Sequence, residues 1–161
     1  MTTLKHYLIV FLVSMVPLIE LRGAIPYGVL FGLPLWQTFL IAIIGNMVPV
    51  PIIFFFARRV LEWGAEKPLI GKLFTFFLEK GHRGGEKLQA KAGRGLYVAL
   101  LLFVGIPLPG TGAWTGTLAA SLLDMDFKKS SLACIGGVLL AGCIMGLLSL
   151  LGVSAFGTIG A

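Results

Sequence analysis

Two charged side chains, Glu20 and Arg22, stand inside a long apolar stretch near the start of the chain. Lys5 and His6 are the other acidic, basic or histidine residues within residues 1–57. A charged side chain at the depth of a lipid bilayer costs roughly 2.5–3.5 kcal/mol on insertion scales. Such charges persist in an apolar chain where protein or a water-filled cavity surrounds them. The pair therefore predicts a buried polar site, and it limits the chain to folds that can shelter one.

Proline and glycine interrupt the helical pattern on both sides of this pair. Residues 16–33 are therefore expected to form a broken segment with non-helical backbone. Residues 4–33 are too long for one straight membrane span of about 20 residues and too short for two. A re-entrant helical hairpin, which enters and leaves the membrane on one side, fits this length, and one broken crossing is the alternative. The residues expected at the break are Pro17, Gly23 and Pro26.

The composition indicates an all-α integral membrane protein. Hydrophobic residues make up 57% of the 161 residues, charged residues make up 12%, and the mean hydropathy is +0.96. These values differ strongly from those of a soluble domain. Nine of the 13 Lys and Arg residues lie within residues 58–94, and such an excess is typical of cytoplasmic loops. We therefore expect a multi-pass protein of the inner or plasma membrane, with a cytoplasmic connection at residues 58–95 and no nucleic-acid partner.

Two apolar segments are long enough to cross a membrane completely. Residues 36–57 and residues 131–151 would each extend for about 30 Å as helices, at about 1.5 Å per residue. Pro49 and Pro51 predict a kink in the first of these spans, because each proline removes a backbone donor. The second span contains small residues that allow another helix to approach closely, and these include Gly142 and Gly146.

A second interruption lies between these spans, at residues 105–116. It follows the apolar segment 96–104 and contains two prolines and four glycines, which do not continue a regular helix. Residues 117–123 then resume the apolar pattern before a polar turn. The residues expected at this second break are Pro107, Pro109, Gly110 and Gly112.

The order of segments is the same in both parts of the chain, which suggests an internal duplication within one membrane domain, residues 1–161. Residues 1–59 form the first repeat and residues 96–161 the second, and each has a broken helical hairpin followed by a full transmembrane helix. Residues 60–95 form an amphipathic and basic connection. If this connection and the turn at 124–129 are both cytoplasmic, the two repeats are inverted, as in many secondary transporters.

The first interruption reads Glu20-Leu-Arg-Gly-Ala-Ile-Pro26, and the second reads Pro107-Leu-Pro-Gly-Thr-Gly-Ala-Trp-Thr-Gly116. Together these motifs resemble those of the small multi-drug export protein family, and the resemblance covers nearly the whole chain. That family is similar, more distantly, to the DedA membrane proteins, whose paired re-entrant hairpins carry acidic residues in one half and arginines in the other. The DedA resemblance implies proton-dependent transport or the return of polyprenyl phosphate carriers across the membrane. The second hairpin has no arginine here, so Arg22 would supply that charge from the first half.

Glu20 is the candidate for binding a proton or a cationic substrate. A carboxyl group in an apolar cavity favours its protonated form, and a nearby guanidinium favours the ionised form. Arg22 is expected to orient Glu20 or to bind an anionic headgroup. The alternative is that Glu20 and Arg22 form a structural ion pair that holds one hairpin to the other.

The second interruption supplies further candidates for substrate binding, namely the side chains of Thr111, Trp114 and Thr115. The alternative for these three residues is that they cap the ends of helices. Asn46 either completes the polar cluster or satisfies the carbonyl groups that the two prolines of the first span leave free.

The first functional hypothesis is a small secondary transporter that moves a drug-like compound or a lipid, coupled to protons through Glu20. A translocase of polyprenyl phosphate or phospholipid, of the DedA type, is one alternative, and a membrane protein with a structural or assembly role is another. A homodimer is expected, because two hairpins and two spans make a thin wall around any pathway. The sequence has no nucleophile with a matching base and no metal-binding cluster, so we expect no enzyme, no cofactor and no metal site.

Overall fold

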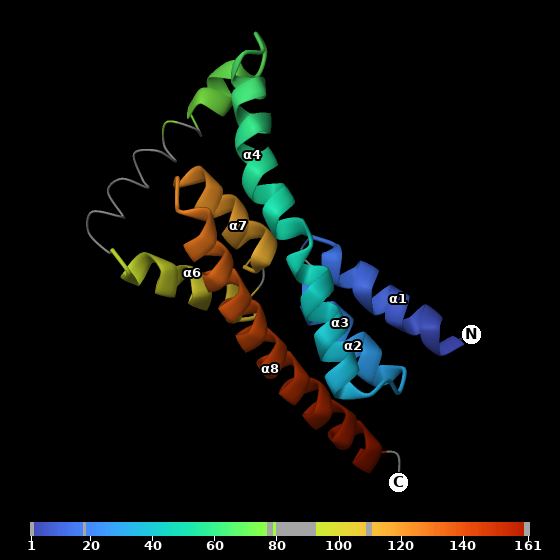
Figure 1. Ribbon diagram of the computed structural model, residues 1–161. Coiled ribbons are helices and arrows are strands. Elements are labelled where there is room, and N and C mark those ends of the chain that lie inside the picture. Colours follow the sequence, from blue (N-terminus) through green and yellow to red (C-terminus); the bar gives the residue numbers. More distant parts are fainter. Residues whose placement is uncertain (1, 18, 77–78, 80–92, 109–110, 160–161) are drawn as a thin grey trace.

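The computed structural model describes residues 2–17, 19–76, 79, 93–108 and 111–159, and within these ranges the protein is entirely helical. Two helices are long and apolar enough to cross a membrane, Leu35–Ala65 and Phe127–Gly152. The expected all-α class is confirmed for this part of the chain. Figure 1 shows the two long helices running down the molecule side by side, with the shorter helices beside and between them.

The N-terminal hairpin consists of α1 (Thr2–Met15) and α2 (Glu20–Leu30). The break between them is shorter than the sequence suggested, because α2 already begins at Glu20. Gly23 and Pro26, expected at the break, lie inside α2. Glycine costs a helix about 1 kcal/mol, and α2 offsets such costs by burying one face in the core. Pro17 does lie in the break.

The first long helix is divided at Val48 into α3 (Leu35–Met47) and α4 (Pro49–Ala65). The division occurs where the expected kink prolines begin. The helix also continues beyond residue 57, the expected end of the span. Arg58 forms an ion pair with Glu62 one turn further on, at 3.1 Å, and the next proline is Pro68. Arg58 and Arg59 therefore lie within α4 and do not mark its end.

Residues 66–76 turn back against the end of α4, where Phe74 packs on Gly64. Residues 71–76 are helical, and most of their side chains are exposed. Leu69, just before this helix, and Leu73, within it, are exposed apolar side chains. The rest of the expected amphipathic and basic connection, residues 77–78 and 80–92, lies outside the described residues.

The second half begins with α6 (Gly95–Gly105) and α7 (Ala113–Leu122), and it ends with the long helix α8 (Phe127–Ile159). The break between α6 and α7 is again shorter than expected, since Trp114, Thr115 and Gly116 lie in the first turn of α7. Pro107 and Gly112 lie within the break, and Pro109 and Gly110 are outside the described residues. Asp126 begins α8 by accepting a hydrogen bond from the Lys129 backbone N–H at 2.9 Å.

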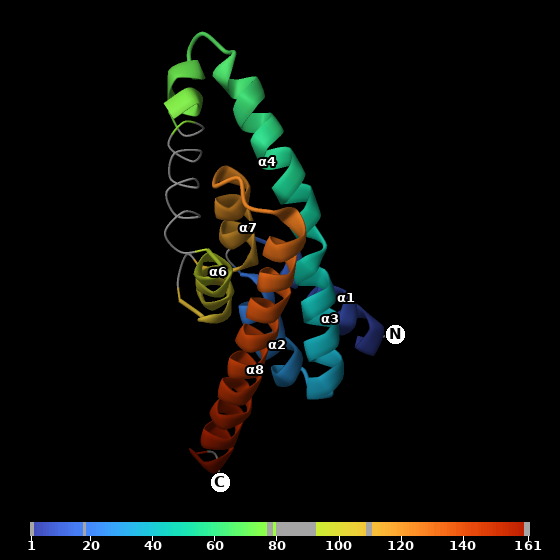
Figure 2. The ribbon, with the colours of Figure 1, turned by 60° about the vertical axis from the view of Figure 1, so that its left-hand side comes forward.

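The two halves pack against each other in a reciprocal way. In the first half α1 packs on α3, and in the second half α6 packs on α8. Across the halves, α2 packs on α8 and α7 packs on α4. Figure 2 shows α7 beside α4 and α2 beside α8. Each hairpin is thus held by the long helix of the other half as well as by its own.

Small residues of α8 allow these close contacts. A Cβ atom placed on Gly142 would lie 2.6 Å from the ring of Phe39 in α3, so the expected close approach at Gly142 is confirmed. At Gly137 a Cβ atom would lie 2.7 Å from the backbone carbonyl oxygen of Leu101 in α6. Glycines of α8 therefore allow two other helices to pack closely against it, α6 at Gly137 and α3 at Gly142.

Candidate functional site

Glu20 is the first residue of α2, and it adopts a backbone conformation that is unusual for a side chain of its kind. Its φ angle is +52°, in the left-handed region, which costs an L-residue about 1–2 kcal/mol. The side chain is buried, with 3% of its surface exposed. The surrounding structure holds Glu20 in this conformation, and strained residues of this kind occur often at functional sites.

The Glu20 carboxylate reaches the N-terminus of α7 in the other half of the chain. Its Oε2 accepts a hydrogen bond from the Ala113 backbone N–H at 3.2 Å, and its Oε1 accepts one from the Trp114 N–H at 3.0 Å. The first N–H groups of a helix have no partner within the helix. The residue before α7 is Gly112, which has no side chain to bind them. Glu20 therefore acts as the N-terminal cap of α7 from a distant part of the sequence.

Gly112 makes room for this carboxylate. A Cβ atom at Gly112 would lie 2.7 Å from Oε1 of Glu20 and closer still to Oε2. The φ angle of Gly112 is +138°, which side chains rarely adopt. Glycine is thus required here both by the backbone conformation and by the approach of Glu20.

Arg22 binds the other end of the same interruption, where α6 ends. Its guanidinium donates to the Leu108 carbonyl oxygen, to the Ile106 carbonyl oxygen at 3.3 Å and to the Thr111 hydroxyl at 2.8 Å. The Thr111 hydroxyl lies 2.9 Å from each of these two carbonyl oxygens. Both carbonyl groups belong to the segment that follows α6, where each also accepts a backbone N–H, and Arg22 binds this segment from α2.

The two charges complement the ends of two different helices. The N-terminus of a helix carries a partial positive charge and the C-terminus a partial negative one. Glu20 faces the N-terminus of α7, and Arg22 faces the segment after the C-terminus of α6. No ion pair joins Glu20 to Arg22 in the part of the chain that the structure describes. The expected structural ion pair is therefore replaced by two separate contacts, both of which hold the first hairpin to the second.

Trp114 adds a third contact between the two interruptions. Its indole Nε1–H donates to the carbonyl oxygen of Met15, the last residue of α1, at 3.0 Å. The Thr115 hydroxyl lies 3.4 Å from the Gly112 carbonyl oxygen, within its own helix. Both the end of α1 and the start of α2 are thus fixed to the first turn of α7.

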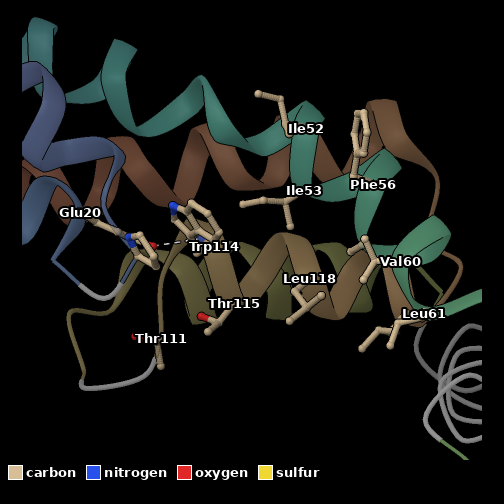
Figure 3. A pocket seen from close by; sticks show the side chains of 13 residues that line it. Glu20, Ile52, Ile53, Phe56, Val60, Leu61, Thr111, Trp114, Thr115 and Leu118 are labelled. Carbon is tan, nitrogen blue, oxygen red and sulfur yellow. Dashed lines mark hydrogen bonds between the residues drawn. The ribbon is translucent and has the colours of Figure 1, made fainter. Parts of the chain in front are cut away.

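An apolar groove of about 620 Å³ extends from this polar junction between α4 and α7. Figure 3 shows Glu20 and Trp114 at one end of the groove and the apolar side chains of both helices along its walls. Thr111 and Thr115 also line it. The walls are formed by Ile52, Ile53, Phe56, Val60 and Leu61 of α4 and by Leu118 and Leu122 of α7. The groove therefore offers a long apolar surface with one acidic side chain at its end.

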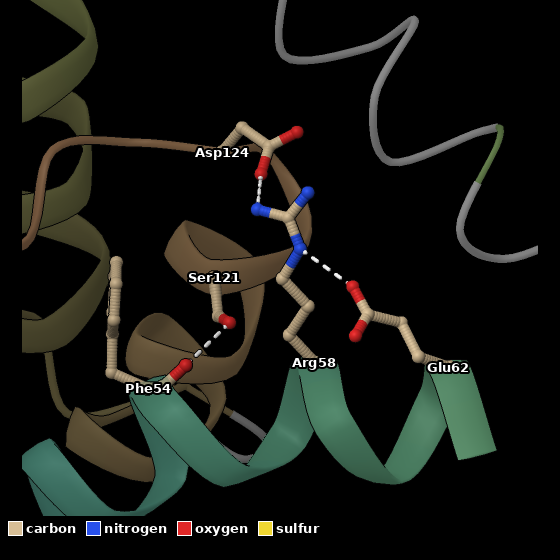
Figure 4. Close-up of polar contacts among 5 residues, drawn as sticks. All are labelled: Phe54, Arg58, Glu62, Ser121 and Asp124. Carbon is tan, nitrogen blue, oxygen red and sulfur yellow. Dashed lines mark hydrogen bonds and ion pairs between the residues drawn. The ribbon is translucent and has the colours of Figure 1, made fainter.

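Polar contacts join α4 and α7 beside the groove, as Figure 4 shows. The Ser121 hydroxyl donates to the Phe54 carbonyl oxygen at 2.7 Å. Arg58 of α4 forms an ion pair with Asp124, in the turn after α7, as well as with Glu62. These contacts set the spacing of the two walls.

Asn46 lies apart from this site. It is 1% exposed on α3, it does not line the groove, and neither of its side-chain polar atoms has a hydrogen-bond partner among the described residues. The hypothesis that its side chain satisfies carbonyl groups freed by the kink prolines is therefore wrong. The structure brings Glu20, Arg22, Thr111, Trp114 and Thr115 together and leaves Asn46 out. Within the described residues no group of three or more His, Cys, Asp and Glu side chains is arranged to hold a metal ion.

The apolar walls are the part of the site that the sequence analysis did not identify. Ile52, Phe56 and Val60 recur at intervals of four residues on α4, and Leu118 and Leu122 do so on α7. Such spacing places side chains on one face of a helix. In a chain that is 57% hydrophobic, the same spacing also describes faces that meet lipid, so the pattern alone does not single out a groove.

Comparison with known families gives one match. The model of a family described as "Putative small multi-drug export protein" matches residues 20–144, which is well over half of the chain. The matched region begins at Glu20, after the break between α1 and α2, and it includes the second interruption and the walls of the groove. Comparisons with curated proteins and with solved structures found no match.

Proposed function

The chain belongs to the small multi-drug export protein family, and from this premise we propose that it carries amphiphilic solutes across the membrane through the groove between α4 and α7, in exchange for protons at Glu20. The family and the two long apolar helices indicate a membrane protein. The groove supports the proposal most directly, because it joins a large apolar surface to a single buried acid.

The substrate that fits this groove is an amphiphile with an apolar body and a cationic group. Its apolar body would lie against side chains such as Ile53, Phe56 and Leu118, where each buried methylene stabilises the complex by about 0.8 kcal/mol. Its cation would approach Glu20, since a carboxylate with two hydrogen bonds still has free lone pairs. A drug-like compound or a lipid with a cationic headgroup has this chemistry.

Protonation of Glu20 would weaken its hold on α7. The ionised carboxylate accepts two hydrogen bonds from the helix N-terminus and balances the positive end of the helix. A protonated carboxyl has no charge to balance that end, and one of its oxygens becomes a donor that faces N–H groups. A proton or a substrate cation would therefore loosen the junction between the halves, and this change couples binding to a movement of α7.

The reciprocal packing supports an arrangement of two inverted repeats. Equivalent helices of the two halves make equivalent contacts, α2 with α8 and α7 with α4. In this arrangement the basic connection at residues 58–95 faces the cytoplasm, and the interruptions meet within the membrane. A homodimer would complete the wall on the open side of the groove.

Substitution of Glu20 by Gln tests the proposal. Glu20→Gln keeps the shape of the side chain and removes its charge. We expect proton-driven export of a lipophilic cation from reconstituted vesicles to fall to the level of empty vesicles. The matched control is Glu66→Gln, at an exposed position after α4 that does not line the groove, and this variant is expected to retain transport. Transport at the unmodified rate in Glu20→Gln, with the protein folded, would refute proton exchange at this residue.

A structural function is the second candidate, and one observation favours it. Both oxygens of Glu20 and the guanidinium of Arg22 are engaged in holding the two hairpins together. If assembly is their only role, the double variant Glu20→Gln with Arg22→Gln would lose thermal stability in detergent, yet any folded fraction would work normally. Transport normalised to folded protein therefore separates the two functions.

A further inference from the structure

A second cavity, of about 510 Å³, lies between α6 and α8, away from the groove described above. Its lining combines two basic side chains, Arg94 and Lys129, with Tyr97 at one end and apolar side chains at the other. The apolar part includes Leu101, Leu132 and Ala133. From this combination we infer that the protein has a site for one anionic phospholipid, with its phosphate between Arg94 and Lys129 and an acyl chain along the apolar part.

The charges at this cavity need an anion. Arg94 immediately precedes α6, and Lys129 is in the first turn of α8. The first turn of a helix disfavours cations, because its partial charge is positive. Neither side chain has an ion-pair partner within the described residues. Asp126, three positions before Lys129, uses Oδ1 to accept the Lys129 backbone N–H at the start of α8.

Tyr97 supplies a neutral donor between the two cations. Its hydroxyl oxygen accepts a hydrogen bond from the Asp126 backbone N–H at 3.4 Å, which leaves its own O–H group for another acceptor. The Lys129 ammonium lies 5.8 Å from the Tyr97 ring, a cation–π contact that keeps it at the cavity. Arg94, Tyr97 and Lys129 all have hydrogen-bond donors, and a phosphate group has oxygen atoms that can accept hydrogen bonds from them.

The apolar part of the cavity selects a lipid over a soluble phosphate. The apolar part of α6 begins soon after Arg94, and that of α8 begins at Leu132, three positions after Lys129. The cations therefore lie near an edge where apolar surface begins. Leu132 is 68% exposed there. A soluble phosphate would use the charges alone and leave this surface uncovered, whereas an acyl chain would cover it. This lipid site does not depend on transport, so it goes beyond the proposed export function.

The test uses the full chain in a neutral detergent and measures bound lipid by native mass spectrometry. Phosphatidylglycerol is expected to bind at least tenfold more tightly than phosphatidylcholine with the same acyl chains. Arg94→Gln and Lys129→Gln are each expected to weaken phosphatidylglycerol binding about fivefold, which corresponds to about 1 kcal/mol per cation. Inorganic phosphate at millimolar concentration is expected to leave the bound lipid in place.

Lys128→Gln is the matched control, because Lys128 is adjacent and exposed but does not line the cavity. It removes the same charge and is expected to leave binding unchanged. Equal losses in Lys128→Gln and Lys129→Gln would show diffuse attraction and refute the site. Equal binding of the two lipids would refute it, as would displacement by inorganic phosphate. Thermal unfolding of each variant checks that it is folded. Tyr97→Phe is a milder variant, because it removes one hydroxyl, and it is expected to weaken phosphatidylglycerol binding about twofold to fivefold.

Discussion

At the scale of single residues, the site depends on one glycine as much as on the acid it admits. Glu20 binds the start of α7 because Gly112 leaves space for the carboxylate and has no cap of its own. The sequence predicted that Glu20 and Arg22 are sheltered, since isolated charges in an apolar run need partners. It did not predict which groups would shelter them. Apart from the Thr111 hydroxyl, these partners are backbone N–H and carbonyl groups, which nearly every residue type can supply.

Substitution of Gly112 by Ala should therefore disrupt the junction. We expect Gly112→Ala to lower the free energy of unfolding by about 2–4 kcal/mol, from backbone strain and from displacement of the Glu20 carboxylate. The measurement is denaturant unfolding in detergent micelles. In a Glu20→Ala background the displacement is absent, so the cost of Gly112→Ala should fall to the backbone strain alone.

Gly32 provides the control for this experiment. It also has a positive φ angle, +71°, and a Cβ atom there would meet no other atom within 4 Å. Gly32→Ala is expected to cost about 1–2 kcal/mol from strain and to leave the junction intact. Gly112→Ala could instead lower the free energy of unfolding equally in the unmodified protein and in Glu20→Ala. That result would show that the contact with Glu20 is not the reason for a glycine at this position.

At the scale of helices, the order and type of the elements followed from the sequence, and their boundaries did not. Pro17, Pro107 and Gly112 lie in breaks as predicted, whereas Gly23 and Pro26 lie inside α2. Local propensity disfavours a helix at these two positions, but the buried face of α2 packs against α1, α3 and α8. Tertiary packing overrides propensity in this way most readily where a short helix is held on several sides.

The contact between α6 and α8 gives a test at this scale. A Cβ atom at Gly137 would meet the Leu101 backbone, which no side-chain rotation relieves, as well as Cβ of Val104. Gly137→Ala is therefore expected to destabilise the protein by about 1–3 kcal/mol, although alanine favours a helix by about 1 kcal/mol relative to glycine. Thermal unfolding in detergent measures the effect.

Gly152 on the same helix provides the control, because a Cβ atom added there would meet no other atom within 4 Å. Gly152→Ala should therefore be neutral or stabilising, since only the helix propensity changes. If both variants were stabilised equally, the helices would not approach as closely at Gly137 as described.

At the scale of the whole molecule, the two halves hold each other through the contacts of α2 with α8 and of α7 with α4. The sequence predicts a repeat from the order of segments, and the charge distribution predicts that the repeats are inverted. The groove between α4 and α7 could not be predicted in the same way, because it depends on contacts between helices far apart in the chain. Apolar residues that face a groove and apolar residues that face lipid have the same pattern in the sequence.

Single-cysteine labelling tests the inverted arrangement. Cysteines would be placed at Lys5, Pro34 and Lys128, all exposed positions, in a variant where Cys134 and Cys143 are replaced by alanine. In intact cells, a membrane-impermeant maleimide is expected to label the first two positions, and to label position 128 only after permeabilisation. Labelling of position 128 from outside, or protection of position 34, would contradict the inverted topology.

The contact between Glu20 and α7 also has a consequence for biosynthesis. The acid and the N–H groups that it binds are separated by 93 and 94 positions along the chain. At a translation speed of about 5–20 residues per second, Glu20 is synthesised about 5–20 s before its partners. During that interval the nascent first hairpin lacks the N–H groups that Glu20 binds, so we expect it to remain at the membrane surface or in the insertion machinery. We therefore expect the first half to complete its insertion only after the second half has been made.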